Sequence, residues 1–190
     1  MSLEKVTDVD ADGRATGDRW SAPLDQDWLE SFLRDVFEDH HEGLSFGPII
    51  EGAAYEMRPP GKPQRVTVSD GYLTVFYGRQ GHFHLCIGRN EGAQTSGGEA
   101  LIRRRAPGKA EFFRGFDRDG APVMWGFRMR NGAEEPMLDL FFPNPFITDD
   151  DQLADAPDWS RLATWEHVRN RWIGAPDDGR DRLGKGFGKG

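Results

Sequence analysis

Cysteine is almost absent from this chain, which has one, Cys86, among 190 residues. A single cysteine cannot form an intramolecular disulfide or a cysteine-rich zinc finger, so both classes of small cross-linked domain are excluded. No apolar run approaches 18 residues, which excludes a membrane-spanning helix. The first twenty residues lack the positive and apolar regions of a secretory signal, so we expect a cytoplasmic protein with a reduced thiol.

Basic charge is also scarce. Lys and Arg number 24 against 32 Asp and Glu, giving a net charge of −8. This sign does not suit a protein that coats nucleic acid, so we expect neither a nucleic-acid nor a membrane partner. Residues 103–130 reverse the balance, because eight basic residues there face only Glu111, Asp117 and Asp119; the basic residues are Arg103, Arg104, Arg105, Lys109, Arg114, Arg118, Arg128 and Arg130.

Large aromatic residues compensate for a modest aliphatic content. The chain has 13 Phe and 6 Trp, each of which buries a large area, so we expect an aromatic core. Acidic residues dominate the start of the chain, and Gly and charged residues dominate its end. We therefore predict a single domain over residues 20–174, a flexible N-terminal segment over 1–19 and a flexible Gly-rich tail over 175–190.

Two helices are predicted near the ends of that domain. Over residues 23–40, apolar residues recur at helical spacing, and Ser21 is the expected N-cap. The second helix is expected to begin at Pro157 and Asp158 and to end at Gly174. Its apolar stripe contains Leu162, Trp165, Val168 and Trp172.

The middle of the chain is rich in strand signals. Asp70-Gly71 separates two β-rich runs and is a strong hairpin signal. The short linkers exclude parallel crossovers. The sequence predicts an α+β fold, an antiparallel meander of about five to seven strands packed against an N-terminal and a C-terminal helix. The further expected strands are 49–57, 82–88, 110–117, 122–130 and 137–142.

The segment Gly81–Gly88 carries the most informative pattern. On a strand, His82, His84 and Cys86 share one face, with neighbours about 6.6 Å apart. Imidazole and thiolate bind transition metals, so the pattern predicts a site for Zn, Fe or Cu. The alternative interpretation is structural, with the histidines as polar surface and the cysteine as packing.

Arginines in the basic segment are candidates for holding an anion. Arg114 and Arg128 alternate with aromatic residues and could orient a carboxylate or phosphate, and Arg128 could share a sheet face with the histidines. The alternative is that these arginines neutralise acidic residues of the helices. No nucleophile elbow, P-loop or zinc-protease motif is present, so catalytic residues stay unassigned.

Three functional hypotheses follow. The leading one is a small-molecule-binding protein, in its sharpest form a metal-dependent enzyme acting on an anionic substrate at the His-x-His-x-Cys face. The second is non-catalytic binding of haem or another planar anion, which needs an axial His, an aromatic wall and arginines. The third is a protein interaction module with an exposed aromatic face. The sequence leaves open whether the protein is an enzyme, and its oligomeric state.

Several segments resemble an uncharacterised family of bacterial proteins of about 190 residues. The resemblance covers roughly residues 80–173 and rests on HFHLCIG, WGFRMRNG, LFFPNPFITDDD and PDWSRLATW. It implies a single conserved type of domain, and it assigns no activity and no catalytic residue.

Overall fold

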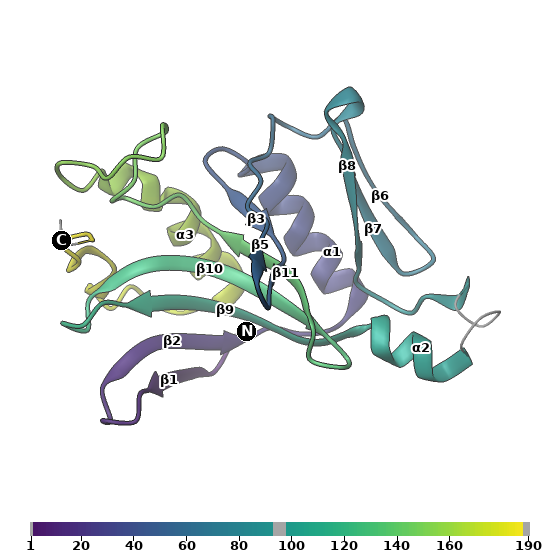
Figure 1. Cartoon of the computed structure of the whole chain (residues 1–190), viewed down its shortest axis with the longest axis horizontal. Coiled ribbons are helices and arrows are strands. Elements are labelled where there is room, and N and C mark those ends of the chain that lie inside the picture. Colours follow the sequence, from purple (N-terminus) through teal and green to yellow (C-terminus); the bar gives the residue numbers. More distant parts are fainter. Residues whose placement is uncertain (1, 93–97, 188–190) are drawn as a thin grey trace. The chain divides into compact units, whose positions relative to one another are not determined.

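The computed structural model describes residues 2–92 and 98–187 (Figure 1). Its helical elements are α1 (Gln26–Arg34), η1 (Asp35–Asp39), η2 (Gly78–Gln80), α2 (Gly98–Arg105), η4 (Trp159–Leu162), α3 (Ala163–Val168), η5 (Arg169–Ile173) and η6 (Arg180–Arg182). Its strands are β1 (Lys5–Val9), β2 (Ala15–Ser21), β3 (Ser45–Gly47), β4 (Ile49–Ile50), β5 (Ala53–Ala54), β6 (Arg65–Ser69), β7 (Tyr72–Phe76), β8 (His82–Cys86), β9 (Pro107–Phe116), β10 (Pro122–Asn131) and β11 (Pro136–Phe141).

The α+β prediction is confirmed, with helices near both ends and a six-stranded sheet in the order β1-β2-β9-β10-β11-β3. The arrangement of strands is less simple than one meander. The strands β6, β7 and β8 form a separate three-stranded sheet, and β4 pairs with β5 alone. The strand β2 pairs with β9, far away along the chain, and local spacing cannot predict such a partner.

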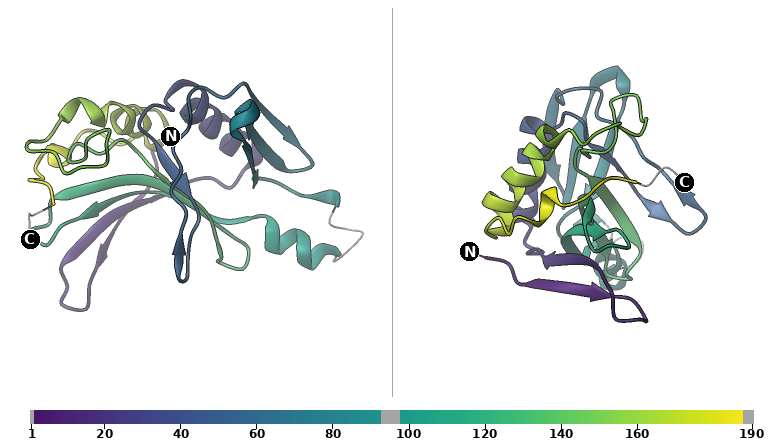
Figure 2. Two further views of the ribbon diagram at one scale, coloured as in Figure 1. Left: turned by 45° about the horizontal axis from the view of Figure 1, so that its top comes forward. Right: turned by 90° about the vertical axis from the view of Figure 1, so that its left-hand side faces the viewer.

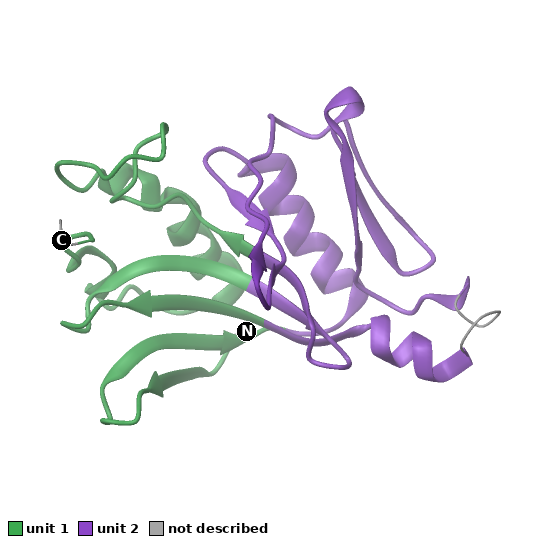
Figure 3. Ribbon diagram, viewed as in Figure 1, with its two compact units in different colours: residues 1–22, 111–127, 140–190 green, residues 23–110, 128–139 purple. Residues whose placement is uncertain are grey.

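The chain groups into two compact units (Figure 3). Unit 1 contains residues 1–22, 111–127 and 140–190, and unit 2 contains residues 23–110 and 128–139. The division into one domain over residues 20–174 and flexible segments on either side of it stays a prediction. The structure adds that the N-terminal segment forms the β1–β2 hairpin, and that η6 lies in the C-terminal tail, of which residues 188–190 fall outside the description.

Aromatic side chains form the core of unit 1. The Trp165 ring on α3 is buried against Trp20 of β2, with ring centroids 5.8 Å apart, and against Phe142 at 6.1 Å. Figure 2 shows the yellow-green C-terminal helix on one side of the teal long strands of unit 1. On the long strands β9 and β10, Phe112 and Phe127 are fully buried, and their ring centroids lie 5.0 Å apart. The predicted second helix is confirmed as η4, α3 and η5, ending at Gly174 in the left-handed region at φ 69°.

Unit 2 packs the first helix against the three-stranded sheet. Phe37 of η1 contacts Phe83 of β8, with ring centroids 5.3 Å apart, and Phe46 of β3 at 5.2 Å. The helix prediction is confirmed, but its N-cap is Asp25 rather than Ser21, which ends β2. The Asp25 carboxylate accepts the Trp28 backbone N–H at 3.0 Å, satisfying a donor that the helix itself cannot.

The predicted hairpin turn at Asp70-Gly71 is confirmed and fixes the register of β6 against β7. Both residues have positive φ, 49° and 76°, as a two-residue hairpin turn with matching twist requires. A Cβ on Gly71 would lie 2.5 Å from the Arg89 carbonyl oxygen. Glycine is therefore required here for both backbone conformation and space.

No helix in the described part of the chain is both long and apolar enough to cross a membrane.

Candidate functional site

The outward face of the three-stranded sheet in unit 2 carries both histidines of the His-x-His pattern. Register places His82 opposite Phe76 on β7, which in turn lies opposite Arg65 on β6. His84 lies opposite Thr74 in the same way. Alternate residues of these strands are buried on the other face, so the histidines must face outward.

The two imidazoles are close and exposed. Their ring centroids are 5.0 Å apart and their planes are inclined by 75°. The Nδ1 atom of His84 shares a hydrogen bond of 2.8 Å with the Thr74 hydroxyl. This contact fixes the ring and leaves Nε2 as the His84 nitrogen directed elsewhere, which is the way outer partners orient metal-binding histidines.

Cys86 shares the face by register but differs in environment. Its side chain is buried at 4% exposure, and its thiol donates to the Gly88 carbonyl at 3.3 Å. Burial raises the pKa of the Cys86 thiol, which disfavours the thiolate that binds metals. The donor atoms of His82, His84 and Cys86 do not all lie within 4.8 Å of one another. The structure therefore brings together the two histidines and leaves the cysteine as a packed thiol.

A cation and an aromatic ring continue the histidine face along the sheet. The Arg65 guanidinium carbon lies 5.4 Å from the centroid of Phe76, whose ring lies 5.7 Å from that of His82. Sequence reasoning missed both residues. The hairpin turn predicts that Arg65 pairs with Phe76, because a two-residue loop sets every pair of β6 and β7. The pairing of Phe76 with His82 depends on the η2 connection, which gives no comparable signal.

Arg128 does not join this face. It lies on β10 of the six-stranded sheet, whereas the histidines lie in the three-stranded sheet. The prediction that Arg128 could share a sheet face with the histidines is therefore wrong. The alternation of residues along a strand predicts which side chains point the same way, but it does not predict which sheet the strand joins. Arg128 is half-buried.

Arg114 lies in unit 1, and protein carboxylates surround it. Its side chain is 2% exposed, and Nε donates to Asp18 at 2.9 Å. Nη1 donates to Asp178 at 3.1 Å and to Asp181 at 3.0 Å. The partners of Arg114 in the structure are the protein's own carboxylates, and the binding of an external anion stays a prediction. The Arg114 contact holds the pKa of Asp178 low, at about 2.

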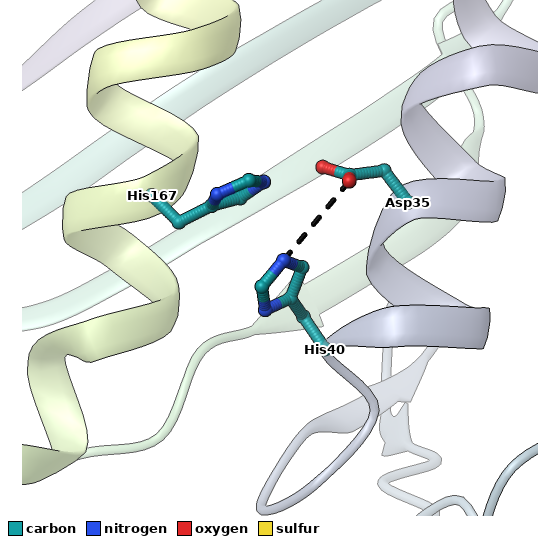
Figure 4. Close-up of side chains that lie close together, drawn as sticks. All are labelled: Asp35, His40 and His167. Atoms are coloured by element: carbon teal, nitrogen blue, oxygen red, sulfur yellow. Dashed lines mark ion pairs between the residues drawn. The ribbon is translucent and has the colours of Figure 1, made fainter.

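A histidine–carboxylate pair lies at the end of the first helix in unit 2. His40 Nε2 lies 4.0 Å from Asp35 Oδ1, the outer limit of an ion pair (Figure 4). The neighbouring His41 has a buried Nδ1 atom without a hydrogen-bond partner. His40 is the C-cap residue of η1, and the helix dipole favours positive charge at that end.

Exposed apolar side chains of unit 2 gather on the segment with the β4–β5 hairpin. Tyr55 and Met57 are 57% and 50% exposed, and Ile49 and Ile50 are also exposed. These residues are aliphatic for the most part, so they differ from the aromatic face expected of an interaction module.

Comparison with known proteins identifies the family of the chain. Residues 6–174 match the model of a family described as "Family of unknown function (DUF7676)", and the chain belongs to that family. Neither the curated proteins nor the solved structures contain a match. The matched region covers β1–β11 and α1–α3 apart from Lys5, the first residue of β1. It ends just before the tail that holds Asp178 and Asp181.

Proposed function

We propose that this member of the family binds a transition-metal ion, Zn, Fe or Cu, through His82 and His84. The observation that carries the proposal is the pair of exposed imidazoles 5.0 Å apart, one of them fixed by Thr74. Imidazole nitrogen suits all three metals. Cys86 takes no part in the proposed coordination, because its thiol is buried and bonded to Gly88.

The proposed metal keeps open coordination positions. Two protein ligands leave the remaining positions to water or a small molecule, as a catalytic metal requires. In this proposal Arg65 orients the anionic molecule, as the sequence first predicted for Arg114 and Arg128, because Arg65 lies on the same face as the histidines. An anionic molecule bound to the metal would meet the guanidinium along the Phe76 ring. Hydrolytic and oxidative reactions both fit this arrangement.

A metal titration tests the proposal. Untagged protein is titrated with Zn²⁺ and Cu²⁺ by calorimetry, and its metal content after purification is measured. We expect one ion per chain, with Cu²⁺ bound more tightly than Zn²⁺. Binding weakens as the pH falls, because protons compete for imidazole nitrogen.

Variants assign the binding to the face. The double variant His82→Ala/His84→Ala should lose the site, whereas His41→Ala, which removes a histidine from the loop after η1, should keep it. Full binding by the double variant would contradict the proposal.

Haem or another planar anion is the second candidate ligand. The observation that favours it is the row of cation, ring and imidazole formed by Arg65, Phe76 and His82. A haemin titration followed by absorbance separates it from the metal ion alone. A Soret shift that disappears in His82→Ala supports haem, and a shift independent of both histidines rejects it.

We place the protein in a bacterial cytoplasm. Its lone thiol supports a reducing compartment, and the resemblance noted from the sequence supports the bacterial source.

A further inference from the structure

The carboxylate of Asp181 is enclosed by four donors in unit 1. The Trp125 indole and Arg114 Nη1 donate to Oδ1 at 2.9 and 3.0 Å. The Trp165 indole and Arg169 Nη1 donate to Oδ2 at 2.7 and 2.6 Å. Each oxygen therefore accepts two hydrogen bonds, and the residue is 2% exposed. Two guanidiniums and two indoles thus donate hydrogen bonds to both oxygens of one carboxylate.

The donors and the carboxylate come from different parts of the chain. The four donor residues lie on β9, β10, α3 and η5, within the region that matches the family. Asp181 lies on η6, in the tail beyond residue 174 where the match ends. The pocket thus belongs to the family domain, and the anion that fills it belongs to the tail.

When the tail is absent, the charges that remain in the pocket favour the binding of an anion. Its buried ionised side chains are then Arg114, Arg169 and Asp18, with a net charge of plus one. Arg169 is 5% exposed, and its Nε atom is buried without a hydrogen-bond partner. Two buried guanidiniums that share one carboxylate are costly, because buried charge needs compensation. The pocket therefore requires a further anion.

The tail is held through its carboxylates and also through Arg180, which lies over the Phe116 ring, and Arg182, which pairs with Glu166. Asp178 reaches Arg114, Asp177 reaches Arg169 Nη1 at 3.3 Å, and Asp181 reaches both. The apolar side chain of Leu183 is 61% exposed and that of Phe187 42%. Phe187 contacts the Phe146 ring, but the large apolar side chains of the tail stay partly exposed, so the carboxylates are its main buried anchors. An external carboxylate at sufficient concentration can compete with them.

We propose that Arg114, Trp125, Trp165 and Arg169 form a binding pocket for small di- or tricarboxylates, which the tail closes by inserting Asp181. Asp177, Asp178 and Asp181 imitate the ligand, since they supply several carboxylates to two adjacent guanidiniums. The tail is a displaceable internal ligand, and it sets the concentration of free carboxylate at which the pocket opens. This inference is independent of the metal proposed at the histidines.

Malonate and citrate are the probes, with sodium chloride of equal ionic strength as the reference. In the full chain, Asp181→Ala removes the internal ligand, and Asp12→Ala is the control that removes an exposed carboxylate of the same unit. Calorimetry and tryptophan fluorescence measure binding. We expect Asp181→Ala to bind malonate roughly tenfold or more tightly than wild type, and Asp12→Ala to equal wild type. Adding Arg169→Gln should abolish the gain.

Hydrogen exchange of the wild-type chain tests displacement without any substitution. We expect saturating citrate to accelerate exchange over residues 175–187 and to leave the β6–β8 sheet unchanged. The proposal is overturned if wild-type exchange of the tail is the same in citrate and in chloride. It is also overturned if a folded Asp181→Ala variant binds malonate no better than wild type.

Discussion

At the scale of single residues, hydrogen-bond partners decide what each candidate side chain can do. His84 is fixed by the Thr74 hydroxyl, while Cys86 is turned to the Gly88 carbonyl. Arg114 binds the protein's own carboxylates Asp18, Asp178 and Asp181, and its predicted role towards an external anion stays a prediction. Residue type and alternation identify such side chains in the sequence. They do not identify partners that lie 64 to 96 positions away along the chain.

The Thr74 contact predicts a measurable effect on metal binding. For Nε2 of His84 to bind the metal, Nδ1 must carry the proton and donate it to the Thr74 oxygen. Thr74→Val removes this acceptor, and we expect about tenfold weaker metal affinity by calorimetry. Thr67→Val is the matched control, because Thr67 pairs with Thr74 on the next strand and is not paired with His84. Equal loss of affinity in both variants would contradict a specific role for Thr74.

The low pKa of Asp178 predicts a contribution to stability that depends on pH. The folded pKa is about 2 against an ordinary 3.8, chiefly because Arg114 donates to the carboxylate. The contribution is therefore present above about pH 4 and is lost as the pH falls towards 2. We expect the stability difference between wild type and Asp178→Asn to shrink over this range. Urea denaturation at several pH values measures it, and a difference that is constant between pH 5 and 2.5 would refute the pairing.

At the scale of elements, local signals predict local structure well. The helix over residues 23–40, the second helix ending at Gly174 and the Asp70-Gly71 turn each depend on neighbouring residues, and all three are confirmed. The β1–β2 hairpin escaped prediction because β1 is short and largely exposed, and because neither strand has a regular alternation of apolar residues. Sheet membership escaped it too, because β2 pairs with β9 through contacts that no local pattern encodes.

The Asp70-Gly71 turn sets the pairing of β6 with β7, the strand that carries Thr74 and Phe76. Gly71→Ala combines a strained positive φ with a Cβ 2.5 Å from the Arg89 oxygen. We expect it to lower the free energy of unfolding by about 1–3 kcal/mol. Gly52→Ala is the control, since Gly52 has a similar φ of 81° and open space around it. Thermal and urea denaturation compare the two, and an equal loss would show that the clash is absent.

At the scale of the whole molecule, Arg114 connects segments from both ends of the chain within unit 1. It lies on β9 and binds Asp18 of β2 together with Asp178 and Asp181 of the tail. A further bond joins the same ends, from the Leu3 N–H to the Ile173 carbonyl at 2.8 Å. In this buried cluster, arginines hold individual aspartates from segments near both ends of the chain.

Removal of Arg114 is predicted to destabilise the whole unit. Arg114→Met leaves Asp18 buried without its main cation and removes one of the two guanidiniums that hold Asp181, which typically costs about 3–5 kcal/mol. Lys5→Met provides the control, because Lys5 is 3.8 Å from Asp18 but 44% exposed, and should cost under about 1 kcal/mol. Chemical denaturation measures both variants. A similar small cost for both would contradict the central place of Arg114.

The most direct test of the function proposed for this chain is electron paramagnetic resonance of the protein loaded with one equivalent of Cu²⁺. We expect the Cu²⁺ spectrum to show nitrogen coupling from two imidazoles in the wild type and in His41→Ala, and to lose it in His82→Ala/His84→Ala. A spectrum of two-imidazole Cu²⁺ that persists in the double variant would contradict it.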